Sequence, residues 1–350
     1  MSAVTATSDG SRHSAPGTLP AILAGDVGAT HTRLAVFAGN PREPVVFESY
    51  ASHDHAGLDE MVRTFLADHP NALEAACFGV AGPVQNGHVK TTNLAWPVDA
   101  ASLARVLGLE SVTLINDLAA NAYGLAELAP DDLEPLNQGV AAPDGACVVI
   151  SAGTGLGEAG VLFGGDGDAI RVIPTEGGHT DFGPRSELEV ELYRFLAAAD
   201  AHVSYERVCS GIGLLNIYRF LRRRSGTSEP AWLAAEITHR DASAAISRAA
   251  LEQRDPVCTE ALDMMVSIYG AEAGNLALKY LATGGVYVGG GIAPQILPKL
   301  RDGTFIRSFA AKGRFAELLG QVPVHVILND DTALLGAAHH ARAIEARIEA

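Results

Sequence analysis

The chain has 350 residues, a length that suits about two domains with a hydrophobic core in each. Hydrophobic residues make up 48% and charged residues 19%, which is typical of a globular protein and excludes a largely disordered one. The formal net charge is −16 and no segment gathers enough lysine and arginine to form a nucleic-acid-binding surface, which argues against nucleic acids and membranes as partners. The charge leaves nucleotides open, because local amides and a metal ion can bind phosphates.

The cysteines and the amino terminus bear on the cellular compartment. Cys77, Cys147, Cys209 and Cys258 lie far apart, and no CxxC pair occurs. We therefore expect neither a structural zinc site nor a disulfide framework, and a reducing cytoplasm suits the chain best. Residues 1–20 are rich in Ser, Thr, Ala, Gly and Pro without an apolar run, and we interpret them as a disordered tail.

Hydrophobic patterning predicts alternating strands and helices along the chain. In the first half, strands are expected at 21–24, 34–38, 45–50, 75–80 and 112–115, and helices at 58–69, 100–107 and 118–128. In the second half, strands are expected at 146–150, 159–163, 285–288 and 322–328, and helices at 187–199, 207–224, 231–251, 256–281 and 332–346. The mixture indicates an α/β fold.

A strand, a Gly/Thr-rich turn and a second strand occur twice, about one domain apart. The turns span 25–32 and 152–157. Such a repeat predicts two similar α/β lobes facing each other across a cleft, and we expect the last helix to return to the first lobe. The expected division is a smaller domain of residues 21–127 plus 330–350 and a larger domain of residues 128–329.

The two turns are candidate phosphate-binding loops. A tight turn between strands can direct backbone amides and a threonine hydroxyl at phosphate oxygens. Each turn alone could be an ordinary hairpin, but two of them at strand ends favour a nucleotide. The groups that could bind a triphosphate from two sides are Gly28, Thr30, Gly153, Thr154 and Gly155. Asp26, at the end of the first strand, is placed to hold a hydrated Mg²⁺.

Other nucleotide motifs are disfavoured. The absence of a Gly-Lys dipeptide excludes a P-loop. The segment from Gly155 to Gly160 matches GxGxxG, and Glu176 lies near the spacing of a ribose-binding acid. A dinucleotide site requires a helix directly after the glycines, whereas here an apolar, strand-like run follows. A dehydrogenase is therefore a weak interpretation.

Four polar side chains are candidates for binding or catalysis. Asp117 follows an apolar strand and precedes a helix, so it is either an N-cap or a general base at the edge of a sheet, and the residues alone leave both open. Glu176 and His179 flank two glycines and could hydrogen-bond a polyol. Glu206 stands at the start of an expected helix, where an acid favourably meets the helix dipole.

Taken together, these segments resemble the bacterial glucokinase family of the hexokinase/actin-like ATPase superfamily. The likeness runs from about Leu23 to His340 and rests on several motifs in a fixed order. The segments are LAGDVGATHTRLAVF (23–37), LINDLAANAYG (114–124), SAGTGLG (151–157), EGGH (176–179), HVSYERVCSG (202–211) and GGVYVGGGIAP (284–294).

The resemblance implies ATP-dependent phosphorylation of a hexose, most simply glucose, in the cleft of a two-lobed actin-like ATPase fold. Asp117 would be the general base, and the sugar would be held by Asn116, Gly155, Glu176, His179 and Glu206. The ATP-binding residues would be Gly25, Asp26, Val27, Gly28, Ala29, Thr30, Gly153, Thr154, Gly290 and Gly291. It also implies Mg²⁺ held by Asp26 through water, closure of the lobes over the sugar, and commonly a homodimer.

The chain departs from the family pattern at a few positions. Ala29, His31 and Ser151 stand where the family usually shows Gly, Asn and Gly. The clustered zinc-binding cysteines of related repressors and kinases are missing, which places the chain in the zinc-free branch. Two alternatives stay open: a non-catalytic sugar sensor of the same fold, and a kinase for another hexose such as mannose or an amino sugar.

Overall fold

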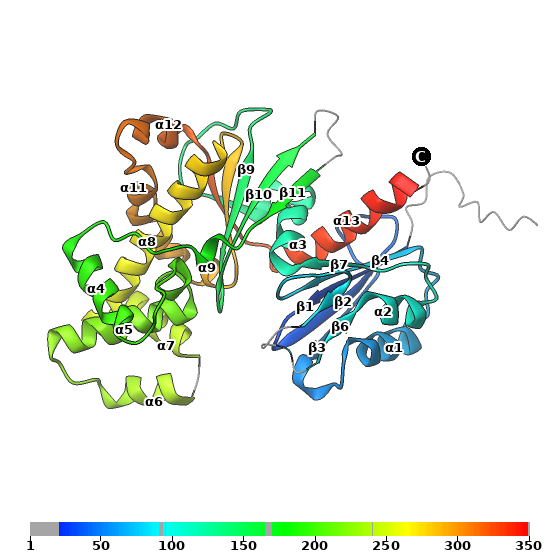
Figure 1. Ribbon diagram of the computed structural model, residues 1–350, viewed down its shortest axis with the longest axis horizontal. Helices are drawn as coiled ribbons and strands as arrows, with labels where there is room; N and C mark the ends of the chain where they lie inside the picture. Colours follow the sequence, from blue (N-terminus) through cyan, green and yellow to red (C-terminus); the bar gives the residue numbers. More distant parts are fainter. Residues whose placement is uncertain (1–20, 91–93, 95, 165–169, 240, 349–350) are drawn as a thin grey trace, which may run out of the picture.

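The structure, a computed structural model, describes residues 21–90, 94, 96–164, 170–239 and 241–348. The expected disordered tail at 1–20 lies outside this range. The described residues form two lobes, each built around a β-sheet (Figure 1). Within them, no helix is long and apolar enough to span a membrane.

The first lobe contains a five-stranded sheet in the order β3-β2-β1-β4-β7. The strands are β1 (Ile22–Val27), β2 (His31–Phe37), β3 (Val46–Ala51), β4 (Ala75–Val80) and β7 (Thr113–Asn116). β1, β2 and β3 pair antiparallel, whereas β1, β4 and β7 pair parallel. A small hairpin of β5 (His88–Val89) and β6 (Val98–Asp99) precedes α2 (Ala100–Leu107), and α1 (Leu58–Asp68) packs against α2.

The second lobe contains a six-stranded sheet in the order β11-β10-β9-β12-β13-β8. The strands are β8 (Leu133–Pro135), β9 (Cys147–Ala152), β10 (Leu156–Phe163), β11 (Ile170–Pro174), β12 (Gly285–Gly289) and β13 (Val324–Ile327). β9, β10 and β11 form the antiparallel part, and β9, β12 and β13 the parallel part. The first five strands in this order repeat the topology of the first sheet, which extends the repeat predicted from the two turns.

Helices make up most of the remaining second lobe. They are α4 (Glu187–Ala197), α5 (Gly211–Ser225), α6 (Ala231–His239), α7 (Ala242–Leu251), α8 (Pro256–Tyr280), α9 (Ile292–Gln295), α10 (Leu297–Leu300), α11 (Thr304–Ala310) and α12 (Ala316–Gln321). The long α8 is buried along most of its length and packs against α5, α7 and α11. This core supports the strand ends that carry the second turn.

Two helices join the lobes. α3 (Asp117–Gly124) and α13 (Thr332–Ile348) lie side by side at the junction (Figure 1). α13 packs on β1 and β4, so the last helix returns to the first sheet as predicted. α3 also contacts the second sheet, where a Cβ on Gly157 would lie 2.9 Å from the Leu118 side chain. The glycine in β10 therefore lets α3 approach the strand closely.

Three expected helices differ from the observed ones. The expected helix at 231–251 is two helices, because the Asp241 side chain accepts hydrogen bonds from the Ser243 and Ala244 amides and caps a new helix. The expected helix at 207–224 begins later, at Gly211, where Ser210 is the N-cap. The expected helix at 118–128 starts at Asp117 and ends at Gly124, followed by a 3₁₀ turn.

Candidate active site

The β1–β2 turn lies at one end of the first sheet. It is closed by a hydrogen bond from the Gly28 amide to the His31 carbonyl at 3.0 Å. Ala29 and Thr30 are exposed at its tip, whereas Gly25 and Val27 are buried. A side chain at Gly25 would collide with the Phe78 ring, so packing alone accounts for that glycine. The exposed tip, with its backbone amides, is the part of this segment that a phosphate can reach.

The β9–β10 turn lies beside the turn that follows β12. The Gly153 amide donates to the Gly155 carbonyl at 2.9 Å, and a Cβ on Gly153 would meet open space. Gly290 has a φ of +82° and packs against the Ala152 carbonyl, a place that only glycine occupies without strain. The buried Tyr269 hydroxyl accepts from the Ala152 amide at 3.2 Å and fixes the end of β9. The predicted second phosphate turn and the predicted adenosine segment are thus neighbours.

Asp26 stands at the end of β1, opposite Arg33 on β2 and Gly79 on β4. Burial raises the pKa of its carboxyl group from 3.8 to about 6. The Arg33 guanidinium opposes this shift, and the carboxylates of Asp117 and Asp331 add to it. Acidic groups from three segments therefore converge near this turn.

The residues around Asp26 fit a magnesium ion. Among the residues the structure describes, no group of three or more His, Cys, Asp or Glu side chains could hold a metal. Mg²⁺ does not need such a cage, because it is commonly bound by one or two carboxylates, water and substrate phosphates. The half-buried Asp26 carboxyl group has a raised pKa and lies near further carboxylates. A divalent cation bound there would reduce the repulsion between these negative charges.

Asp117 is not the cap of α3. The N-cap is Asn116, whose side-chain oxygen accepts from the amides of Leu118 at 3.0 Å and Ala119 at 3.3 Å. The N-cap interpretation of Asp117 is therefore wrong, although its carboxylate also accepts from the Leu118 amide at 2.9 Å. Burial raises the pKa of Asp117, and the Glu176 carboxylate adds to the rise. A raised pKa makes the carboxylate a stronger base.

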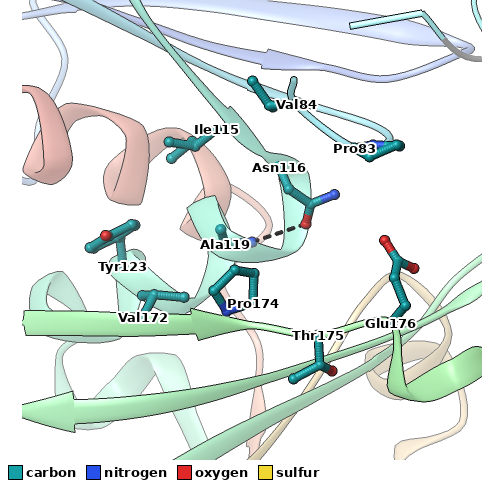
Figure 2. Close-up of a pocket in the computed structure, with 10 residues that line it drawn as sticks. All are labelled: Pro83, Val84, Ile115, Asn116, Ala119, Tyr123, Val172, Pro174, Thr175 and Glu176. Atoms are coloured by element: carbon teal, nitrogen blue, oxygen red, sulfur yellow. Dashed lines mark hydrogen bonds between the residues drawn. The ribbon is translucent and has the colours of Figure 1, made fainter. Parts of the chain in front are cut away.

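A cleft of about 460 Å³ separates the lobes beside Asn116. Its walls come from both lobes, and Figure 2 shows Asn116 and Glu176 on opposite sides. The lining residues are Pro83, Val84, Ile115, Asn116, Ala119, Tyr123, Val172, Pro174, Thr175 and Glu176. The Glu176 side chain is 72% exposed, so this side of the cleft is open.

The other candidate sugar residues lie at the start of β10. Glu206 lies directly against Gly155, and its Oε2 accepts from the Leu156 amide at 3.1 Å. Glu206 belongs to a 3₁₀ turn (Tyr205–Arg207) that precedes α5, so the expectation of a helix start is wrong. The His179 ring lies 4.0 Å from the Glu176 carboxylate. Asp117, Gly155, His179 and Glu206 are not among the described residues that line this cleft.

Sequence reasoning missed part of the site. The apolar wall of Val84, Tyr123 and Val172 carries no motif of its own. Glu158 is 1% exposed behind the segment that carries Glu176. The sequence did contain a signal for Glu158, because it is the one acidic residue in the otherwise apolar strand Leu156–Phe163. A buried acid needs a compensating partner or a function.

Comparison with known proteins decides the family. The glucokinase family model matches residues 23–344. The chain belongs to the glucokinase family. A glucokinase of a Nostoc species is 43% identical over 338 residues, covering 91% of this chain and 97% of the Nostoc protein. Membership of this family implies ATP as the phosphate donor.

Solved glucokinases share the architecture. The crystal structure of a glucokinase from an Antarctic psychrotroph superposes with a TM-score of 0.80 at 31% identity, covering 93% of this chain and 99% of that one. A ROK-family glucokinase from Streptomyces griseus, solved with glucose and AMPPNP, gives a TM-score of 0.64 at 20% identity and covers 92% and 99%. The predicted two-lobed actin-like ATPase fold is confirmed.

Proposed function

We propose that this chain transfers the γ-phosphoryl group of ATP to the 6-hydroxyl of glucose in the cleft between its lobes. The observation that carries the proposal is the placement of Asn116 and Asp117 across the cleft from Glu176, with Asp26 and the β1–β2 turn close by. Asn116 and Glu176 line the cleft, Asp117 directly follows Asn116, and the Asp117 carboxylate lies close enough to Asp26 to add to the rise in its pKa. A base, a polyol-binding acid and a candidate magnesium ligand are then near neighbours. A non-catalytic sugar sensor of the same fold would need no base.

The sugar would be held by side chains from both lobes. Asn116 keeps its amide nitrogen near the cleft, where it donates to the Gly82 carbonyl at 3.2 Å. Glu176 and His179 supply an acceptor and a ring nitrogen on a separate loop. The Glu206 carboxylate contacts Gly155, whose lack of a side chain makes room for it. The sugar would contact both residues. Polar pairing of this kind supports selection among hexoses.

Asp117 would accept the proton of the 6-hydroxyl as that oxygen attacks the γ-phosphorus in line. The O–P bond to the sugar forms, the bond to the bridging oxygen of ADP breaks, and the proton resides on the Asp117 carboxylate. Asn116 caps α3 and so leaves the Asp117 carboxylate available for this role. Further catalysis would come from positioning and from amides directed at the phosphates.

The ATP site would combine the three turns. The half-buried Gly28 and the exposed Ala29 and Thr30 would contact phosphates from one lobe, with the buried Gly25 and Val27 supporting them from the core. Gly153 and Thr154 would contact them from the other lobe. Gly290 and Gly291 would face the adenosine. Asp26 would hold Mg²⁺ through water, which when bound offsets the negative charge of the phosphates.

The proposed domain boundaries follow from the helix that returns to the first sheet. We assign residues 21–127 and 330–350 to the smaller domain and residues 128–329 to the larger, with closure of the two over the sugar. We also propose that the protein is a homodimer located in the cytoplasm.

A coupled assay with a panel of hexoses and phosphoryl donors tests the function. Glucose with ATP should give the highest kcat/KM. A hexose that leaves one buried polar group of the site unpaired should lose about 1–3 kcal/mol of transition-state binding. Equal turnover of glucose and galactose, or faster turnover with ADP or polyphosphate, would contradict the proposal.

A further inference from the structure

A buried carboxyl group lies behind the candidate sugar loop and has no part in the mechanism above. Glu158 on β10 is 1% exposed, and its Oε1 has no hydrogen-bond partner. An unpaired carboxyl group in a protein interior costs stability, so its presence calls for a physical reason.

Glu158 contacts the sugar loop through both its side chain and its backbone. A Cβ on Gly177 would collide with Glu158 Oε2, so the carboxyl group presses directly on that glycine. The Glu158 carbonyl accepts from the Thr175 hydroxyl at 2.8 Å, and the same hydroxyl accepts from the Gly177 amide at 3.1 Å. Glu158 therefore contacts the segment that carries Glu176 through both its carboxyl group and its backbone carbonyl.

The groups that face Glu158 come mainly from α8. Glu272 on α8 is fully buried and pairs with Lys279 at 3.2 Å. Burial is the main cause that raises the pKa of Glu158 to about 7; the Glu272 carboxylate adds to the rise and the Lys279 ammonium opposes it. Besides burial, the Glu158 carboxylate also contributes to the raised pKa values of the Tyr269 and Tyr280 hydroxyls and the Cys209 thiol.

Glu272 is also linked, through Asn275, to the turn that carries Glu206. The Asn275 amide nitrogen donates to Glu272 Oε2 at 2.7 Å and to the Tyr205 hydroxyl at 3.1 Å. Tyr205 directly precedes Glu206 in the same 3₁₀ turn. Glu158 and Glu272 thus stand behind the two loops that carry the proposed sugar-binding acids.

We propose that Glu158 is a positioning residue of the sugar site, whose neutral carboxyl group supports the Gly177 loop and thereby sets the affinity for glucose. The inference rests on the proposed function, because it assigns sugar binding to that loop. Ionisation of Glu158 would place a second buried negative charge beside Glu272. The affinity for glucose should therefore be highest below the pKa of Glu158 and should weaken as the pH rises through about 7.

Two substitutions test the proposal by kinetics and by calorimetric titration with glucose. Glu158→Ala removes the support, and we expect the KM and Kd for glucose to rise by about tenfold or more, since small displacements of binding groups are costly. The KM for ATP and the kcat should change little. Glu158→Gln keeps the size and stays neutral, so its glucose Kd should remain low and flat between about pH 6 and 8, where the wild-type Kd rises.

Asp255→Asn is the matched control. Asp255 is 3% exposed and pairs with Arg222 at 2.8 Å, at the start of α8 and away from the sugar loops. This control should lower the melting temperature without changing the Kd for glucose. If Glu158→Ala fails to fold, the Gln variant decides: a pH dependence parallel to that of wild type overturns the proposal. An Ala variant with unchanged glucose Kd does the same, whereas wild type that neither binds nor phosphorylates glucose overturns the proposed function instead.

Discussion

Asp26, the proposed magnesium ligand, has a carboxyl group whose charge the ligand-free protein compensates only in part. It lies within a strand whose other members are fully or almost fully buried, and its nearest positive group is Arg33. Arg33 is already engaged, since it donates to the Asp330 carbonyl at 2.8 Å and lies 3.6 Å from the Asp331 carboxylate. The charge of Asp26 is therefore only partly compensated.

The pH dependence of Mg·ATP binding tests this role. The pKa of Asp26 is raised to about 6, so its ionisation lowers the stability of the ligand-free protein as the pH rises from 3.8 through that value. Ionisation also creates the carboxylate that Mg²⁺ requires. The increase in melting temperature caused by Mg·ATP should therefore grow between about pH 5 and 7. Asp26→Asn should show a smaller increase with a weaker pH dependence, because the γ-phosphate of ATP itself ionises between about pH 6 and 7. A wild-type increase that depends on pH no more than that of the variant would contradict the role.

At the scale of elements, the strand-end turns combine packing with binding. Gly290 and Gly291 are adjacent in sequence and both are proposed to contact adenosine. Their backbones differ, because Gly290 has a φ of +82° against the Ala152 carbonyl, whereas a Cβ on Gly291 would meet nothing within 4 Å. Substitution by alanine can therefore separate the two contributions.

We expect Gly290→Ala to lower both the melting temperature and the affinity for ATP, because the new Cβ strains the backbone and pushes on β9. Gly291→Ala should keep the melting temperature and raise only the KM for ATP, since its Cβ enters the space proposed for the nucleotide. Thermal denaturation and ATP titration of both variants provide the comparison. A Gly291 variant with wild-type ATP kinetics would place the adenosine elsewhere.

At the scale of the whole molecule, the repeated topology was open to prediction. Two Gly/Thr turns between apolar strands predict two lobes. The first sheet and the first five strands of the second sheet have the same topology. Strand β4 and helix α2 were predicted at their observed bounds, because both have clear hydrophobic patterning. Short or edge elements such as β8 and β11 were missed, since a few half-buried residues leave no periodic pattern.

The motifs of the candidate site could be predicted from the sequence, whereas the contacts that position its side chains could not. Asp117 and Asn116 could not be assigned separate roles from sequence, because either can cap a helix, and only the structure shows that Asn116 does. The contact of Glu206 with Gly155 joins residues far apart in the chain. Such pairings depend on how the lobes fold and lie beyond any local pattern.

The most direct test of the central claim is the turnover of Asp117→Asn. Because Asn116 caps α3, this substitution should leave the melting temperature and the calorimetric affinity for glucose unchanged or slightly improved. Asparagine cannot accept a proton at neutral pH, and general-base catalysis typically contributes about 10²–10⁴-fold, so kcat should fall at least about a hundredfold. Asp331→Asn, which removes a more exposed carboxylate that, like Asp117, lies near Asp26, is the matched control and should keep most of the activity. An Asp117→Asn enzyme that retains more than about a third of the wild-type kcat would show that Asp117 is not the base, since so small a loss lies far below a general-base contribution.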